Sequence, residues 1–551
     1  MEYGLLAPFV LAASAIAPRG PADSGAALWA SAAEGACRLG PEAIVVAGAL
    51  AVLLLDLAIP RRLSSELAWV AAAACAASLA VLRVAPAEPR GIVFGALASD
   101  PFARFFREFF LAGTLAAILL SRSSRALAAR RCGEYYFLLL TALFGAMALA
   151  SSAHFASLFV SLETLSVSTY ALVGYFRSDR AGAEAALKYA LYGAVASAIL
   201  AYGLSVWFGL TGSGDLRSLA RILGASGDAA GDRRAALAVL FAATCVFAGL
   251  AYKTSLAPMH FWAPDAYQGA PTPVAAFLSV VSKGAGFALA LRFFASLSAS
   301  TQALEEGSPA AAFWRSVDWS PVISASAVLA MTLGNLAAFF QTNVKRLLAY
   351  SSIAHAGTMA IGLAMVRPGA GSAGVEAVAY YLVAYLAMNF GAFGVVSLVE
   401  DATGSVEIDA YRGLGRRAPA LAFAFAAFLF SLIGIPPTAG FVAKFQLLLG
   451  AIGVGSRLGA SGAPLSWQYP ALVGAAVLNT VLSAFYYLRI VKAMYLEGGP
   501  EAPAAPAEGL LARAPRLPGV IVVASMLALT FYACLRAGRF LAAAAGLSIA
   551  S

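Results

Sequence analysis

Lysine side chains inside long apolar runs are the first feature of this chain that suggests chemistry. Only six of its 37 basic residues are lysine. Four of the six, Lys188, Lys253, Lys283 and Lys444, fall inside or at the edge of such runs, whereas the arginines lie mainly between the runs. A lysine in a low-dielectric site can release its proton near neutral pH, but an arginine stays protonated. The pattern therefore favours a proton relay built on lysines.

One carboxylate lies near the middle of an apolar run. Glu163 is the only acidic or basic residue in FASLFVSLETLSVSTYALVGYF. A lone charge at mid-bilayer costs roughly 2.5–3.5 kcal/mol on insertion scales, so it needs a partner or water. We expect Lys253 to be that partner, and a pair that forms and separates would act as a switch on the lysine's proton. A static ion pair that holds two helices together is the alternative.

Further polar residues extend this set. His355, in LLAYSSIAHAGTMAIGLA, is of the one residue type that exchanges protons near neutrality without a large change of environment; a core histidine bonded to a neighbouring helix is the alternative. Glu184 lies four residues before Lys188, which places both on one helix face and is consistent with a local ion pair; the entry of a proton path is the alternative. His260 and Asp265, in MHFWAPDAYQGAP, are expected to fix a loop.

The composition indicates which kind of secondary structure carries these residues. The chain has 551 residues, of which 61% are hydrophobic and 12% charged, and its mean hydropathy is +0.81. Such values are typical of an integral membrane protein with helices of roughly 20 apolar residues. We predict fourteen membrane-spanning helices, over residues 41–59, 66–84, 104–121, 135–152, 155–176, 184–208, 235–257, 272–298, 321–340, 347–366, 375–399, 418–453, 469–495 and 518–537.

Two of the predicted helices contain breaks. Pro258 follows Lys253 by five residues in the seventh, and Pro437 precedes Lys444 by seven in the twelfth. Because the twelfth segment also carries Pro436 and Gly440, we interpret it as one discontinuous helix. Interrupted segments at corresponding positions of two halves predict a transporter of inverted repeats with its ion path near the breaks. Two ordinary proline kinks are the alternative.

Other function classes find no support in the sequence. The five cysteines have no CxxC or Cys/His spacing, so neither an iron–sulfur cluster nor a zinc site is indicated. There is no Walker loop and no HExxH motif. The net charge of +9 comes largely from arginines in short connections, which is a pattern of membrane topology and not of a nucleic-acid-binding face.

Several motifs, in order along the chain, carry a resemblance to a known family. They are SLETLSVSTYALVGYFR, EAALKYALYGA, YKTSLAPMHFWAPDAYQGAPTPVAAFLS, SKGAGF, KRLLAYSSIAHAG, YYLVAYLAMNFGAFGVV and GIPPTAGFVAKF. Together they resemble the antiporter-like membrane subunits of respiratory complex I, the NADH-quinone oxidoreductase, and within them the subunit N group. The resemblance covers roughly residues 41–495. Lys283 supports subunit N, because the related L and M subunits usually carry a histidine there.

The resemblance implies an architecture and a set of relay residues. It implies an all-α polytopic protein of fourteen helices: helices 1–3 over 41–134, two inverted five-helix repeats over 135–298 and 321–495 with discontinuous helices 7 and 12, and a linker with helix 14 over 496–551. Residues 1–40 lie outside it. The implied proton relay starts at a Glu163–Lys253 pair and continues through Lys283, His355 and Lys444, with Lys188 nearby.

The resemblance also implies a function. The chain is expected to move protons across a bacterial inner membrane while NADH is oxidised and quinone reduced elsewhere in the complex. No cofactor is expected in this chain; NAD, flavin, iron–sulfur clusters and quinone belong to partner subunits. Its expected partners are other membrane subunits, including antiporter-like neighbours, and the lipid bilayer, with no nucleic acid. The alternatives are a subunit of a multi-subunit sodium/proton antiporter and a scaffold whose buried ion pairs only hold neighbouring pumps in register.

Overall fold

The computed structural model describes residue 35 and residues 38–84, 91–128, 130–176, 179–216, 233–302, 317–367, 371–460, 465–498 and 517–535. Its elements, in chain order, are α3 (Gly40–Ala58), η1 (Arg61–Glu66), α4 (Leu67–Val84), β1 (Gly91–Val93), β2 (Leu97–Ser99), α5 (Pro101–Ser123), α6 (Arg125–Ala128), α7 (Gly133–Ser151), α8 (Phe155–Val173), α9 (Arg180–Thr211), α11 (Arg233–Thr254), α12 (Trp262–Gly269), α13 (Thr272–Phe277), η3 (Leu278–Ser282), α14 (Lys283–Gln302), α16 (Ser320–Ala338), α17 (Val344–Ala364), α18 (Ala373–Thr403), η4 (Ile408–Tyr411), α19 (Leu414–Arg417), α20 (Pro419–Ile433), α21 (Ala439–Ala460), α22 (Gln468–Tyr495) and α24 (Leu517–Leu535).

The prediction of an all-α polytopic membrane protein is confirmed. Thirteen helices among the described residues are long and apolar enough to cross a membrane. The predicted span 104–121 corresponds to α5, which is 23 residues long but carries four charged residues and is therefore less apolar. Each of the other predicted spans overlaps one of the thirteen helices. Within the predicted span 418–453 that helix is α21, because α20 is too short to be one of them. Most of the predicted extension 1–40 and most of the linker after 498 lie outside the described residues.

Both predicted breaks are present. Helix 7 stops at Thr254 and resumes as α12, so it extends further than the expected 235–257. Helix 12 is divided between α20 and α21, and Gly434, with a φ of 91°, ends the first half. Proline has no backbone N–H and its ring clashes with the preceding turn, so Pro258, Pro436 and Pro437 cannot continue either helix. Helix 8 changes from α13 through one π-turn, η3, to α14.

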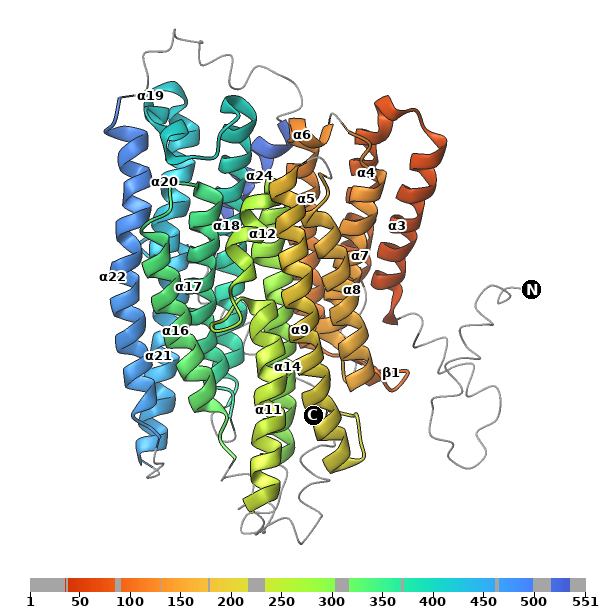
Figure 1. Cartoon of the computed structure of the whole chain (residues 1–551), viewed down its shortest axis with the longest axis vertical. Helices are drawn as coiled ribbons and strands as arrows, with labels where there is room; N and C mark the ends of the chain where they lie inside the picture. Colours follow the sequence, from red (N-terminus) through yellow and green to blue (C-terminus); the bar gives the residue numbers. More distant parts are fainter. Residues whose placement is uncertain are drawn as a thin grey trace, which may run out of the picture.

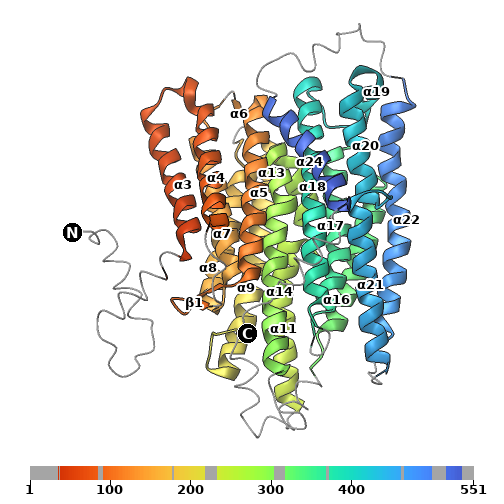
Figure 2. The same ribbon diagram turned by 180° about the vertical axis from the view of Figure 1, so that it is seen from behind.

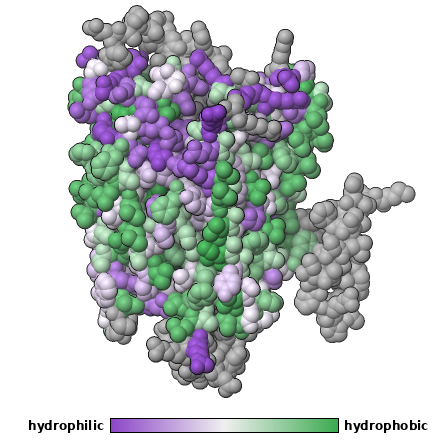
Figure 3. All heavy atoms as spheres, in the orientation of Figure 1, coloured by the Kyte–Doolittle hydropathy of each residue, from purple (hydrophilic) through white to green (hydrophobic). Residues whose placement is uncertain are grey.

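The helices stand side by side, with early helices at one end and late helices at the other, except that the last described helix, α24, packs back against α18 and α5. Figure 1 and Figure 2 show α3 and α4 at one end of the row, α21 and α22 at the other, and α14 between them. The segment Thr272–Ala299 lies wholly inside the bundle, and α17 and α18 are almost as deeply buried. Figure 3 shows hydrophobic side chains over the middle of one face, with hydrophilic side chains gathered at the upper end. Charges in the centre are therefore enclosed by helices.

One buried ion pair connects the start of α5 to α14 in the middle of the bundle. Asp100 caps α5, with its Oδ1 accepting from the Ala103 N–H at 2.7 Å. Both its oxygens also accept from Arg292 of α14, at 2.9 Å each, and Arg292 Nε donates to the Ala150 carbonyl at 2.6 Å. Because an arginine keeps its proton and this pair is fully hydrogen-bonded, it is a fixed structural link.

The turn that follows α9 and the turn that follows α18 have the same local structure. Helices α9 and α18 both end at a threonine followed by a glycine with positive φ, 66° at Gly212 and 73° at Gly404. Each threonine hydroxyl donates to the carbonyl four residues before it and to the carbonyl two residues after it. The residue four positions after each threonine forms a β-bridge with the N-cap of an earlier helix, and these pairs are His154 with Asp215 and Asn343 with Glu407. The shared contacts align α8 with α17 and α9 with α18.

Candidate functional site

The first buried lysine lies against α8. Lys253, in the last turn of α11, is 2% exposed, and its Nζ donates to Ser166 Oγ at 3.1 Å. Glu163 lies three residues before Ser166, and residues at this spacing share a helix face. Its Oε1 accepts from Ser197 Oγ of α9 at 2.5 Å. Lys253 therefore contacts the face of α8 that carries Glu163, but in the described part of the chain the hydrogen bonds of these two side chains go to Ser166 and Ser197 rather than to each other.

The second buried lysine opens α14. Lys283 is 1% exposed, and its Nζ donates to the Ser352 carbonyl at 2.6 Å and to Ser352 Oγ at 2.5 Å. It directly follows the π-turn η3, a local geometry that is frequent at functional sites. One turn further along α14 is Gly286, where an added Cβ would lie 3.2 Å from Lys253 Cγ. The stem of Lys253 thus packs one helical turn from Lys283.

His355 lies one helical turn after Ser352 on α17, next to the hydroxyl groups of two tyrosines. The two residues are three apart on α17, so they share a face. His355 Nδ1 is 2.7 Å from Tyr381 Oη, and its Nε2 is 3.4 Å from Tyr487 Oη. Tyr385 Oη donates to Ser352 Oγ at 2.8 Å. Tyrosine hydroxyl oxygens thus lie next to Ser352, which accepts from Lys283, and next to His355, one helical turn further along α17.

A small polar cavity separates His355 from Lys444. Its volume is about 10 Å³, close to the space that one water molecule needs, and Asn335, Thr358 and Asn479 also line it. Lys444, on α21, donates from Nζ to the carbonyls of Leu432 at 3.1 Å and Ile433 at 2.8 Å. These are terminal carbonyls of α20, where the helix dipole favours a cation.

Lys188 lies in a different cluster. Its Nζ is 2.7 Å from Glu184 Oε1, so the predicted local pair is confirmed, and 3.0 Å from Asp265 Oδ2. Asp265 belongs to helix α12 rather than to a loop, and its Oδ1 is 2.6 Å from Nη1 of Arg346 on α17. Sequence reasoning missed Arg346; its only signal is a position beside Lys345 at the start of an apolar run.

Metal ligands do not gather among the residues that the structure describes. No three His, Cys, Asp or Glu side chains in those ranges come together in a way that would hold a metal ion. Cys75, Cys132, Cys245 and Cys534 are free thiols, and Cys37 lies outside the described residues. The polar row from Glu163 to Lys444 therefore consists of groups suited to protons, namely amines, an imidazole, hydroxyls and a carboxylate.

Comparison with known proteins places this arrangement in a family. Residues 152–462 match the family described as NADH:quinone oxidoreductase/Mrp antiporter, TM. The NADH-quinone oxidoreductase subunit N of Anaeromyxobacter sp. (strain Fw109-5) is 41% identical over 466 residues, which cover 83% of this chain and 87% of the relative. This chain belongs to the subunit N family of NADH-quinone oxidoreductase.

Solved structures share the fold of this chain. A chain of the respiratory complex I of Thermus thermophilus is 31% identical, with a TM-score of 0.68, and the match covers 92% of this chain and 99% of that one. A chain of the Mrp complex from Dietzia sp. DQ12-45-1b reaches a TM-score of 0.70 at 20% identity, over 93% of this chain and 97% of that one. At that identity the second likeness shows a shared fold alone. The chain is a multi-pass membrane protein of the complex I type.

Proposed function

We propose that this chain moves protons across a bacterial inner membrane as a subunit of NADH-quinone oxidoreductase. The names of its subunit N relatives support this assignment. Electron transfer from NADH to quinone then takes place in partner subunits, which hold the NAD, flavin, iron–sulfur clusters and quinone. Other membrane subunits, including antiporter-like neighbours, flank this chain in the bilayer.

The observation that carries the proposal is the row of polar contacts through the middle of the bundle. Lys253 and Lys283 are buried and Lys444 is partly buried, yet their hydrogen-bond acceptors in the described part of the chain are hydroxyls and carbonyls. Neutral acceptors hold a cation less firmly than a carboxylate does, since charge-assisted pairs are roughly twice as strong. A structural role alone would favour the fully paired arrangement of Arg292 and Asp100.

The contacts support an order of proton transfer. Glu163 and Lys253 form the switch: their approach holds a proton on the lysine, and their separation releases it toward Lys283. Ser352 then connects Lys283 to the turn of α17 that carries His355. The small cavity, with room for one water molecule, connects His355 to Lys444. We take residues 135–298 and 321–495 as the two repeats that contribute these groups, between helices 1–3 (41–134) and the C-terminal segment (496–551).

Replacing Lys253 by methionine tests the proposal. Met has a similar length but carries no proton, so Lys253→Met should lower the proton-to-electron ratio at least about tenfold, since a positioned proton-transfer group typically contributes about 10²–10⁴-fold to a rate. The ratio is measured in inverted membrane vesicles that oxidise NADH, with assembly checked on a native gel. Lys492→Met is the matched control, because Lys492 is 62% exposed and pairs with Glu497 at 3.2 Å outside the row.

Three outcomes separate the possible functions. Loss of pumping in an assembled Lys253→Met complex, with Lys492→Met unchanged, supports the proton relay. A normal proton-to-electron ratio in assembled Lys253→Met overturns it. Sodium/proton exchange that proceeds without NADH or quinone would reassign the same lysines to an antiporter.

A further inference from the structure

The proposed relay has a gap between its first two lysines. Lys253 donates to Ser166 on α8, whereas Lys283 donates to Ser352 on α17. The two acceptors thus belong to different predicted repeats, and in the described part of the chain no hydrogen bond joins either serine to the other lysine. A proton that leaves Lys253 therefore needs further groups between Ser166 and Lys283.

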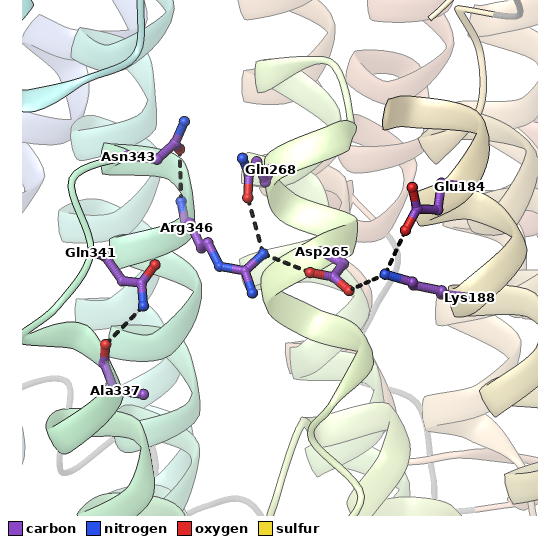
Figure 4. A network of polar contacts seen from close by, with 8 residues as sticks. All are labelled: Glu184, Lys188, Asp265, Gln268, Ala337, Gln341, Asn343 and Arg346. Atoms are coloured by element: carbon purple, nitrogen blue, oxygen red, sulfur yellow. Dashed lines mark hydrogen bonds and ion pairs between the residues drawn. The ribbon is translucent and has the colours of Figure 1, made fainter. Parts of the chain in front are cut away.

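The charged side chains of α9, α12 and α17 form a network that does not fill this gap. Figure 4 shows Lys188 between Glu184 and Asp265, with Arg346 on the other side of Asp265. Two carboxylates hold the proton of Lys188 by charge-assisted hydrogen bonds, and an arginine keeps its proton in a protein. This network therefore holds the three helices together and is not a route for protons.

Hydroxyl groups fill the gap on the side of α8. Thr169 lies three residues after Ser166, and residues at this spacing share a helix face. Its Oγ1 donates to the Ser166 carbonyl at 2.8 Å and is 3.3 Å from Tyr189 Oη of α9, where either oxygen can be the donor. Thr169 and Tyr189 are both fully buried. The contacts lead from the serine beside Lys253 to the hydroxyl of Tyr189.

Ser282 offers a hydroxyl on the side of Lys283. It is the last residue of the π-turn η3 and directly precedes Lys283. Its Oγ is buried and has no hydrogen-bond partner among the described residues, and Tyr189 is one of the side chains close to it. A buried polar group without a partner is rare in proteins. The Ser282 hydroxyl is thus available to the hydroxyl of Tyr189.

Aromatic neighbours fix the ring of Tyr189. It stacks on Trp262, with centroids 4.2 Å apart and ring planes 14° apart, and it meets Tyr170 edge-on at 4.6 Å. Tyr252 Oη donates to the Tyr189 backbone carbonyl at 2.6 Å. A group that transfers protons must stay within hydrogen-bond reach of its partners. The ring keeps the Tyr189 oxygen in one place, while its O–H bond remains able to rotate.

We propose that Tyr189 is a proton-transfer residue that connects Lys253 to Lys283. The inference rests on the proposed relay. Lys253 gives one proton to Ser166, and each hydroxyl in turn, through Thr169 and Tyr189 to Ser282, accepts a proton on one side as it releases its own on the other. Neutral Lys283 accepts the last proton. Every hydroxyl is neutral before and after the transfer, and rotation of the O–H bonds restores the starting arrangement.

Replacing Tyr189 by phenylalanine removes the hydroxyl and keeps the ring beside Trp262. We expect the initial rate of NADH-driven acidification of inverted vesicles to fall at least about tenfold at equal assembly, since a positioned proton-transfer group typically contributes about 10²–10⁴-fold to a rate. Tyr469→Phe is the matched control. Tyr469 is also fully buried, but its hydroxyl donates to the Ala364 carbonyl at 3.0 Å, outside the proposed route.

Variants of Thr169 and Ser282 test the two sides of the bridge. Thr169→Val has nearly the same shape without the hydroxyl and should lower the rate about threefold or more, whereas Thr169→Ser retains the hydroxyl and should restore it. Ser282→Ala should also lower the rate. Ser279→Ala in the same π-turn is its control, because the Ser279 hydroxyl already donates to the Ala276 carbonyl at 2.7 Å.

A structural role of the Tyr189 ring predicts a different pattern. Tyr189→Leu removes both the hydroxyl and the stack on Trp262. If Tyr189→Phe pumps normally and only Tyr189→Leu loses pumping or assembly, the ring is structural and the inference is overturned. Loss of pumping in assembled Tyr189→Phe, with Tyr469→Phe unchanged and Thr169→Ser active, supports it.

The outcomes also distinguish this inference from the proposed function. If Lys253→Met abolishes pumping while Tyr189→Phe pumps normally, the relay remains and only the bridge through Tyr189 is lost. If Lys253→Met also pumps normally, the relay itself is wrong.

Discussion

The two halves of the molecule use corresponding positions for different side chains. Helices α8 and α17 both start at an N-cap bridged to the same kind of turn, at His154 and Asn343. Nine residues after these caps, α8 has Glu163 and α17 has Ser352. Both belong to the proposed relay, but only the first is an acid. In the proposed relay, the first half therefore changes the charge around its lysine, whereas the second half offers neutral groups that accept and return a proton.

The broken helices of the two halves, helix 7 and helix 12, also differ in where their lysine lies. Lys253 lies in the last turn of the helix before its break, whereas Lys444 lies after its break and reaches back to the Leu432 and Ile433 carbonyls. Both ammonium groups thus lie near the C-terminus of the first half-helix, where the dipole favours a cation. Glu163 lies on α8 one turn before Ser166, the serine that Lys253 contacts, whereas α17 has Ser352 at the corresponding position. We therefore infer that the first half switches and the second half conducts.

An acidic residue placed in the second half should remove the difference between the switching half and the conducting half. Ser352→Asp places a carboxylate where Lys283 now meets a hydroxyl at 2.5 Å and a carbonyl at 2.6 Å. The new charge-assisted bond would hold the proton on Lys283. We expect the proton-to-electron ratio to fall at least about tenfold, because a positioned proton-transfer group typically contributes about 10²–10⁴-fold to a rate. The ratio is measured in inverted vesicles with NADH as donor.

Ser352→Asn is the control for this change, because it has nearly the same size as aspartate but carries no charge. Its complex should pump several times better than the aspartate variant at equal assembly. Equal pumping by the serine, asparagine and aspartate complexes would show that Lys283 does not exchange its proton at this place, and the division between the halves would be lost.

Much of the fold was predictable from the sequence, for physical reasons that single elements illustrate. Long apolar runs define spans, and Pro258 and Pro437 define breaks, because a proline cannot continue a helix wherever it is placed. Sequence did not place Asp265 correctly, since WAPDAYQG is too short and too polar to stand out as a helix. Its neighbours Lys188 and Arg346 come from 77 and 81 residues away in the chain.

Side-chain type and the family resemblance predict the relay residues, but neither predicts the contacts between them. An ionisable residue within an apolar run is costly, which draws attention to Glu163 and Lys283 without any structure. The serines that accept from the lysines, Ser166 and Ser352, carry no such cost and resemble many other serines in the sequence. Register between helices decides which serine is used, and that register is set by packing.

Replacing His355 tests the conducting half with a smaller expected effect. His355→Gln keeps hydrogen-bonding atoms near Tyr381 and Tyr487 but removes a group that binds and releases protons. Water in the adjacent cavity can carry part of the transfer, so we expect a loss of about threefold to fivefold, below the usual range for a proton-transfer group. Initial rates of vesicle acidification measure it, and an unchanged rate would make His355 a structural histidine.

Matched glycine substitutions test whether the halves correspond outside the relay. Gly212 and Gly404 have φ values of 66° and 73°, and an added Cβ would meet nothing within 4 Å at either. Alanine at each site therefore introduces backbone strain alone, of about 1 kcal/mol. We expect Gly212→Ala and Gly404→Ala to lower the Tm of the assembled complex by similar small amounts, roughly 1–3 °C, with pumping unchanged. A large difference between the two shifts would show that the two turns are not equivalent, and the alignment of Glu163 with Ser352 would lose its basis.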